Sequence, residues 1–135
     1  MSVISGYILQ VKKIIEELPH ILSDKLITDN RGDVVLYLKG EIVFTNLCEL
    51  HLKEYFISLP EFKKIAYSYH YQDVNKELIF RYDNAEHHPE LENFPYHKHV
   101  GDKPRSSEEI SLEKVLGIII DQISKSVSPD EYRQE

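Results

Sequence analysis

The chain has 135 residues, the usual length of one domain, and we expect a single domain over residues 1–128 followed by a frayed tail over residues 129–135. It carries 16 basic and 23 acidic residues, a formal net charge of −7, which argues against a generic phosphate binder that relies on clustered Lys and Arg. Cys48 is the only cysteine, which excludes an intramolecular disulfide and fits a cytoplasmic protein. No apolar run approaches the roughly 20 residues that cross a bilayer, so we expect no membrane segment.

The first predicted element is a helix over residues 2–18. Its apolar side chains recur at steps of three and four and therefore form one stripe, Ser2 can cap its start, and Pro19 ends it. A core-facing helix is the expected reading of this stripe. An edge strand over residues 21–29 is predicted next, because the turn sequence Asn30-Arg31-Gly32-Asp33 follows it.

Two alternating runs, residues 34–44 and 50–56, predict an antiparallel hairpin. Thr45-Asn46-Leu47 is its tight connection. Gly40 interrupts the apolar face of the first run, which indicates either a bulge or a point of close approach.

A second hairpin is predicted from residues 62–72 and 77–83, which alternate sharply. A four-residue loop over residues 73–76 pairs Gln72 with Glu77, and in this register the apolar faces of the two strands agree. The polar face then carries three side chains of interest: His70, Arg81 and Asp83.

Residues 84–105 show no periodicity, contain three prolines, and are predicted to form a long histidine-rich loop. The last helix is predicted to start near Ser106, where Ser106-Ser107-Glu108-Glu109 has the pattern of a capping box, and to end at Ser128. The expected fold is therefore α+β: an N-terminal helix, a four- to five-stranded antiparallel meander, the loop, and a C-terminal helix.

The histidines point to chemistry, because five of the seven fall between residues 67 and 100. RNA cleavage without a metal needs a base, an acid and cations for the phosphorane charge, and His, Lys and Arg can share these tasks. The candidate catalytic residues are His70, Arg81, His88, His97, Lys98 and His99. The candidate substrate-binding residues are Tyr82, Asp83 and Tyr96.

Other readings of the same residues stay open. Histidines 87, 88, 97 and 99 with the nearby carboxylates could ligate zinc, but their spacing matches no strong metal motif, so no metal or cofactor is expected. The alternating tyrosines of residues 67–71 are more often core packing than base-stacking surfaces. Arg81 and Asp83 could simply pair with each other.

Three stretches carry a resemblance to a known family: Tyr67-x-Tyr-His-Tyr-Gln-Asp, Ile79-Phe-Arg-Tyr-Asp-Asn-Ala-x-His-His-Pro and Phe94-Pro-x-His-Lys-His. They resemble the TumE-like proteins of bacterial and archaeal toxin–antitoxin pairs. This chain departs from the family pattern at Tyr96, where members often carry His, and at Glu86, where they often carry Pro.

The resemblance implies the toxin of a type II pair, encoded beside a cognate antitoxin protein. The first hypothesis is a metal-independent endoribonuclease that acts on RNA, with the ribosome as one candidate target, and a homodimer is left open. The alternatives are a non-enzymatic protein-interaction module and a His-ligated metal-dependent hydrolase.

Overall fold

The computed structural model describes residues 1–86, 90–91, 93–101 and 103–126. The described elements are, in chain order, α1 (Val3–Glu17), β1 (Ile21–Arg31), β2 (Val35–Phe44), β3 (Glu49–Ile57), β4 (Lys63–Gln72), β5 (Leu78–Asp83), β6 (His97–Val100), β7 (Lys103–Ser106) and α2 (Leu112–Ser126). The predicted α+β class is confirmed: one helix precedes the strands of an antiparallel sheet in the chain and one helix follows them.

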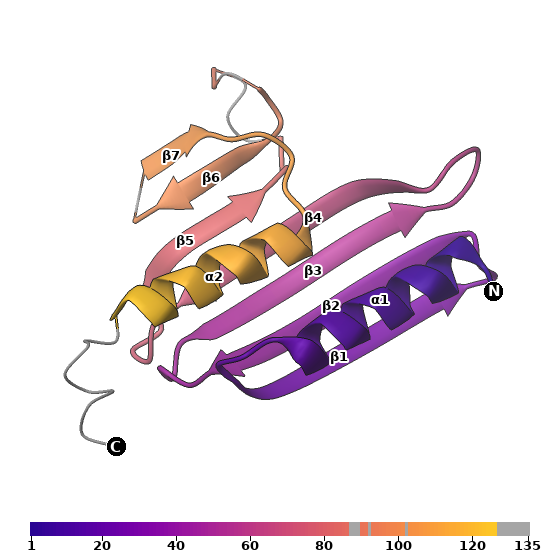
Figure 1. The fold of residues 1–135 in the computed structure, drawn as a ribbon. Helices are drawn as coiled ribbons and strands as arrows, with labels where there is room; N and C mark the ends of the chain where they lie inside the picture. Colours follow the sequence, from indigo (N-terminus) through magenta and orange to yellow (C-terminus); the bar gives the residue numbers. More distant parts are fainter. Residues whose placement is uncertain (87–89, 92, 102, 127–135) are drawn as a thin grey trace.

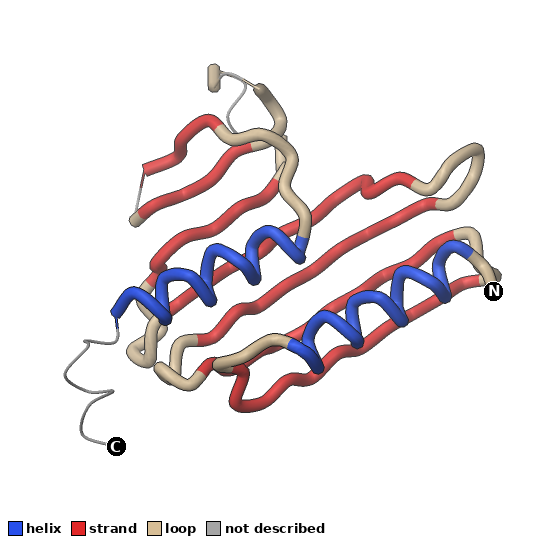
Figure 2. Tube along the Cα trace, viewed as in Figure 1, coloured by secondary structure: helices blue, strands red, loops and turns tan. Residues whose placement is uncertain are grey.

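All the strands belong to one antiparallel meander in the order β1-β2-β3-β4-β5-β6-β7. Both helices lie on the same side of this sheet, with α1 along β1 and β2 and α2 along its middle (Figures 1 and 2). The other side carries no helix of the described chain. As far as the structure describes the chain, the fold therefore has two layers and one sheet face without helices, the open face.

The N-terminal helix forms as its sequence predicts. Ser2 is the N-cap, and its hydroxyl accepts a hydrogen bond from the Ser5 amide at 3.0 Å. The apolar stripe packs inward, with Ile4, Val11 and Ile15 buried. Burial of this stripe, rather than intrinsic helix propensity, holds a helix of this length on the sheet.

The strands bury one face through strict alternation. Along β2 and β3 every second side chain is buried on the helix side. Gly40 pairs with Leu26 on one side and Leu52 on the other without a break in register, so there is no bulge at this position. A Cβ at Gly40 would lie 3.1 Å from Leu26 Cδ1 and 3.2 Å from Leu52 Cγ, so the glycine allows a close approach.

The register of β4 against β5 differs from the expectation by two residues. Tyr71 lies opposite Phe80 rather than Leu78, and a bulge follows it. The turn explains the shift, because Asp73 Oδ1 accepts from the amides of Asn75 at 2.9 Å and Glu77 at 3.0 Å. A shift of two residues keeps every side chain on its expected face, so His70, Arg81 and Asp83 do share the open side.

The predicted number of strands is wrong, because the described residues form a sheet of seven strands rather than four or five. The additional hairpin, β6 and β7, lies within the stretch predicted to be a loop. Gly101 begins its turn with φ of 62°, and Pro104 falls on the edge strand β7, where a missing amide is tolerated. Two four-residue strands are too short to show a period in the sequence.

The predicted start of the last helix is also wrong. Ser106 belongs to β7, and α2 begins at Leu112. Ser111 is the residue that caps it, since its hydroxyl accepts from the Lys114 amide at 3.1 Å. The segment between Ser106 and Ser111 carries the chain from the sheet edge to the helix side. The expected tail over residues 129–135 lies outside the described residues.

Candidate functional site

A row of polar side chains crosses the open face at one level of the sheet. His51 on β3 lies opposite His70 on β4, His70 lies opposite Arg81 on β5, and Arg81 lies opposite His99 on β6. Residues that are direct cross-strand partners have side chains on the same face and within reach of one another. Arg81 is therefore flanked by two histidines from the neighbouring strands.

Asp83 organises the end of β5 next to this row. Asp83 as a whole residue is 5% exposed, and its Oδ2 accepts a hydrogen bond from Arg81 Nε at 2.9 Å. Oδ1 accepts from the Ala85 amide at 3.0 Å and lies 2.8 Å from His97 Nε2. Oδ2 also lies 3.9 Å from His99 Nε2. A single buried carboxylate thus holds the guanidinium and both β6 histidines around it.

His97 has an oxygen atom close to each of its ring nitrogens. It is 2% exposed, and Nδ1 lies 2.9 Å from the Pro95 carbonyl oxygen, which can only accept, so Nδ1 carries a hydrogen. Nε2 faces the Asp83 carboxylate, a second acceptor. A doubly protonated imidazolium or a bound cation would satisfy such an arrangement. Because the ring is buried, His97 acts on β6 and Asp83 rather than on a solvent-borne substrate.

His70 has a defined tautomer. Its Nδ1 lies 3.2 Å from Arg81 Nη1, which can only donate, and its Nε2 lies 3.1 Å from Gln72 Oε1. The hydrogen is therefore on Nε2, and Nδ1 keeps its lone pair. Burial and the Arg81 charge hold the pKa of His70 below its ordinary value. At neutral pH the ring is neutral and can accept a proton.

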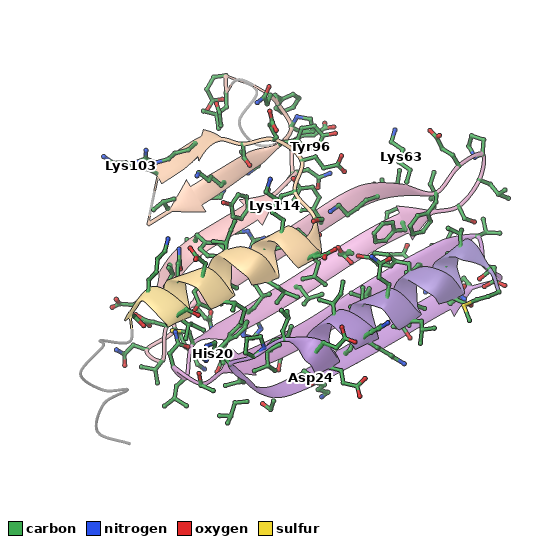
Figure 3. The ribbon with its side chains drawn as sticks, in the orientation of Figure 1. His20, Asp24, Lys63, Tyr96, Lys103 and Lys114 are labelled. Atoms are coloured by element: carbon green, nitrogen blue, oxygen red, sulfur yellow. The ribbon has the colours of Figure 1, made fainter. Side chains whose placement is uncertain are left out.

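Three other predicted site residues are not on the open face. Lys98 and Tyr82 lie opposite each other between β6 and β5 on the helix side, with Lys98 Nζ 5.9 Å from the Tyr82 ring centre. Tyr96, labelled in Figure 3 just ahead of β6, packs against the hydrophobic core. His88 lies outside the described residues. The structure thus brings together His70, Arg81, Asp83, His97 and His99.

His51, which was not among the residues predicted from the sequence, extends the row on β3. Its Nε2 lies 2.9 Å from Glu49 Oε1 and its Nδ1 lies 3.6 Å from Glu41 Oε1. The signal was present, because aligning the β3 and β4 runs in antiparallel register places it opposite His70. The two imidazole centres are 6.5 Å apart.

A buried carboxylate on the helix side of the sheet was also not predicted from the sequence. Glu54 is 3% exposed and accepts hydrogen bonds from the hydroxyls of Tyr7, at 2.6 Å, and Tyr69. Lys64 Nζ donates to Tyr69 Oη at 2.9 Å and to the Ile110 carbonyl at 2.6 Å. Burial, aided by the Glu54 charge, raises the pKa of Tyr69. This network links α1, β3, β4 and the approach to α2, and it is enclosed by them, so its role is to fix the two layers.

One group of described residues has the donors of a cation site. Asp83, His97 and His99 each offer one ligand atom, and these atoms lie within 4.8 Å of one another. Carboxylate and imidazole donors suit zinc and other divalent transition metals. The hydrogen bond from His97 Nδ1 to a backbone carbonyl is the support that metal-bound histidines commonly have.

Comparison with known proteins gave one finding. The family model described as Toxin TumE matches residues 11–127. No curated protein and no solved structure matches the chain. In the part of the chain that the structure describes, neither helix is long and apolar enough to cross a membrane.

Proposed function

Since the chain belongs to the TumE family of toxins, we propose that it is the toxin of a toxin–antitoxin pair and that it acts by cutting RNA on the open face of its sheet. Membership of a toxin family implies an antitoxin that holds the activity in check. The match itself says nothing about the reaction, so the cleavage proposal depends on the site.

The observation that carries the proposal is the placement of Arg81 between His70 and His99 on three adjacent strands. Metal-free cleavage of RNA needs two proton-transfer groups on either side of a phosphate and a cation at the phosphate. Strands of a sheet position these groups more precisely than a loop would. Asp83 then serves as a positioning residue for Arg81.

Each group has a defined task in this scheme. His70, kept neutral by burial and by Arg81, takes the proton from the ribose 2′-hydroxyl as that oxygen attacks the adjacent phosphorus. Arg81 turns from Nδ1 of His70 to the phosphorane oxygens and stabilises their charge. His99, beside the Asp83 carboxylate, donates a proton to the leaving 5′-oxygen. The products are a 2′,3′-cyclic phosphate and a free 5′-hydroxyl.

Expression of the chain without an antitoxin tests the proposal in cells. We expect growth arrest and fragmentation of cellular RNA, and we expect His70→Gln and His99→Gln to relieve both. His20→Asn is the matched control, because His20 lies between α1 and β1, away from β5 and β6, and its φ of 67° suits Asn. Arrest that is unchanged in both site variants would refute the assignment.

A metal-dependent hydrolase is a second candidate function, favoured by the three donors Asp83, His97 and His99. In that case the cation would supply an activated water, and Arg81 would still bind the phosphate. Elemental analysis of protein purified without a His-tag separates the two candidates. A stoichiometric transition metal that is lost in His97→Gln would favour the hydrolase.

A further inference from the structure

Two matched pairs of side chains lie on the open face beside the catalytic row, which consists of His51, His70, Arg81 and His99. Lys39 of β2 is the direct partner of Lys53 of β3, and Tyr37 is the direct partner of Tyr55. The two tyrosine rings have centres 4.8 Å apart with planes tilted by 35°. The residue Tyr37 is 43% exposed. The face therefore offers two cations and two aromatic rings at adjacent levels.

The lysine pair has an unbalanced charge. Among the described residues, no carboxylate oxygen lies within 4.0 Å of the ammonium nitrogen of Lys39 or Lys53. The two aspartates nearby are paired with arginines instead: Asp29 lies 3.1 Å from Arg31 and Asp83 lies 2.9 Å from Arg81. Like charges placed directly opposite on a sheet repel each other and cost stability. An anion bound between the two ammonium groups would remove this cost.

A hollow joins the two pairs to the catalytic row. It has a volume of about 630 Å³ and runs from Ile27 and Asp29 on β1 across the lysines and tyrosines to Arg81 and Asp83. The exposed Glu86 lies at its rim. Three strand spacings separate β2 from β5, about 14 Å. That length suits an extended polymer rather than a single small anion.

We propose that this surface, made of Tyr37, Lys39, Lys53 and Tyr55, binds the single-stranded RNA substrate beside the site of cleavage. This inference rests on the proposed function and names its substrate class. The lysines contact phosphates, a base stacks on the tyrosines, and the chain continues toward Arg81. Sheet faces that combine aromatic rings with cations are a common way to hold unpaired RNA. Because rings and charges read no base edges, binding tolerates many sequences.

Binding is measured by fluorescence anisotropy with a 2′-O-methyl oligonucleotide, which has no free 2′-hydroxyl and so stays intact. A salt titration counts the phosphate contacts, because log K falls with log salt by about 0.7 per contact on a single strand. We expect Lys39→Gln combined with Lys53→Gln to reduce the slope by about 1.4. Lys12→Gln combined with Lys13→Gln, on the exposed side of α1, is the charge-matched control and keeps the wild-type slope.

The tyrosines are tested in the same assay. We expect Tyr37→Leu combined with Tyr55→Leu to weaken binding about tenfold with little change in salt slope, because stacking is lost and charge is kept. Melting curves confirm that each variant is folded. Equal slopes for the site and control lysine pairs would overturn the inference, as would binding of an acidic peptide in place of the oligonucleotide.

The assay separates this inference from the proposed function. If Lys39→Gln combined with Lys53→Gln lowers the salt slope while the wild-type protein leaves natural RNA intact, the binding surface is supported and the cleavage mechanism is refuted. If natural RNA is cut while the oligonucleotide binds all variants equally, the cleavage mechanism stands and the binding surface fails.

Discussion

Asp83→Asn tests whether the buried carboxylate organises the site. Asn keeps the size of the side chain and can still accept from the Ala85 amide, but it has no charge to place against Arg81 and His97. The contact with His97 is buried on both sides, at 2% and 7% exposure of the two side chains, whereas Arg81 is 38% exposed and its contribution is reduced by solvent screening. Removing one partner from a buried pair costs 3–5 kcal/mol, so we expect a loss of about 3 kcal/mol.

Urea denaturation measures this loss as a change in the free energy of unfolding at constant m value. Asp24→Asn on the exposed part of β1 is the control, and we expect it to stay within about 0.5 kcal/mol of wild type. His97→Gln should cost a similar amount to Asp83→Asn, and the double variant should fall short of the sum by about 1–3 kcal/mol, because both changes remove one contact. A loss below about 1 kcal/mol for Asp83→Asn, or full additivity, would refute the reasoning.

Three further predictions concern the rest of the molecule. Glu54→Leu leaves the buried Tyr69 hydroxyl and the partly buried Tyr7 hydroxyl without their carboxylate acceptor, and urea denaturation should show a loss of about 3 kcal/mol; a neutral result would contradict the stabilising role of this network. Gly40→Ala should cost about 1–3 kcal/mol in the same assay, because its Cβ would crowd two leucines; a gain in stability would show that they move freely. For His70 the folded-state pKa is lowered from 6.5, so its stabilising contribution is present above pH 6.5 and is lost as pH falls through the lowered value. We therefore expect His70→Gln to flatten the acid side of the profile of stability against pH. We also expect kcat/KM of the wild type to fall on the acid side at a pH below 6.5. A stability profile that His70→Gln leaves unchanged, together with a fall of kcat/KM above pH 6.5, would exclude His70 as the base.

Much of the fold could be predicted because its patterns are long. The α1 stripe and the alternation along β2 to β5 each extend over several turns or side-chain pairs, and burial of one face enforces them. The shared face of His70, Arg81 and Asp83 followed from this alternation alone, and it survived an error of two residues in register. The Ser2 cap of α1 and the faces of these strands are local properties that the sequence states directly.

The rest depends on contacts between distant segments. The four residues of β6 adopt a strand conformation because they pair with β5. This pairing places His97 and His99 on the open face as part of the sheet, whereas the sequence predicted a loop lying over the sheet. The Gly101-Asp102 dipeptide between the two runs was a usable hairpin signal. The burial of Glu54 had no local signal, because its partners Tyr7 and Tyr69 come from other elements.

Cleavage of RNA by the purified chain tests the central claim most directly. End-labelled single-stranded RNA is incubated with the wild-type protein in the presence of EDTA, and the fragment ends are identified. We expect fragments that end in a 2′,3′-cyclic phosphate, with a rate lower by about 10²-fold or more in His70→Gln and in His99→Gln, the usual contribution of a proton-transfer group. RNA that stays intact, or site variants that cut as fast as the wild type, would contradict the account.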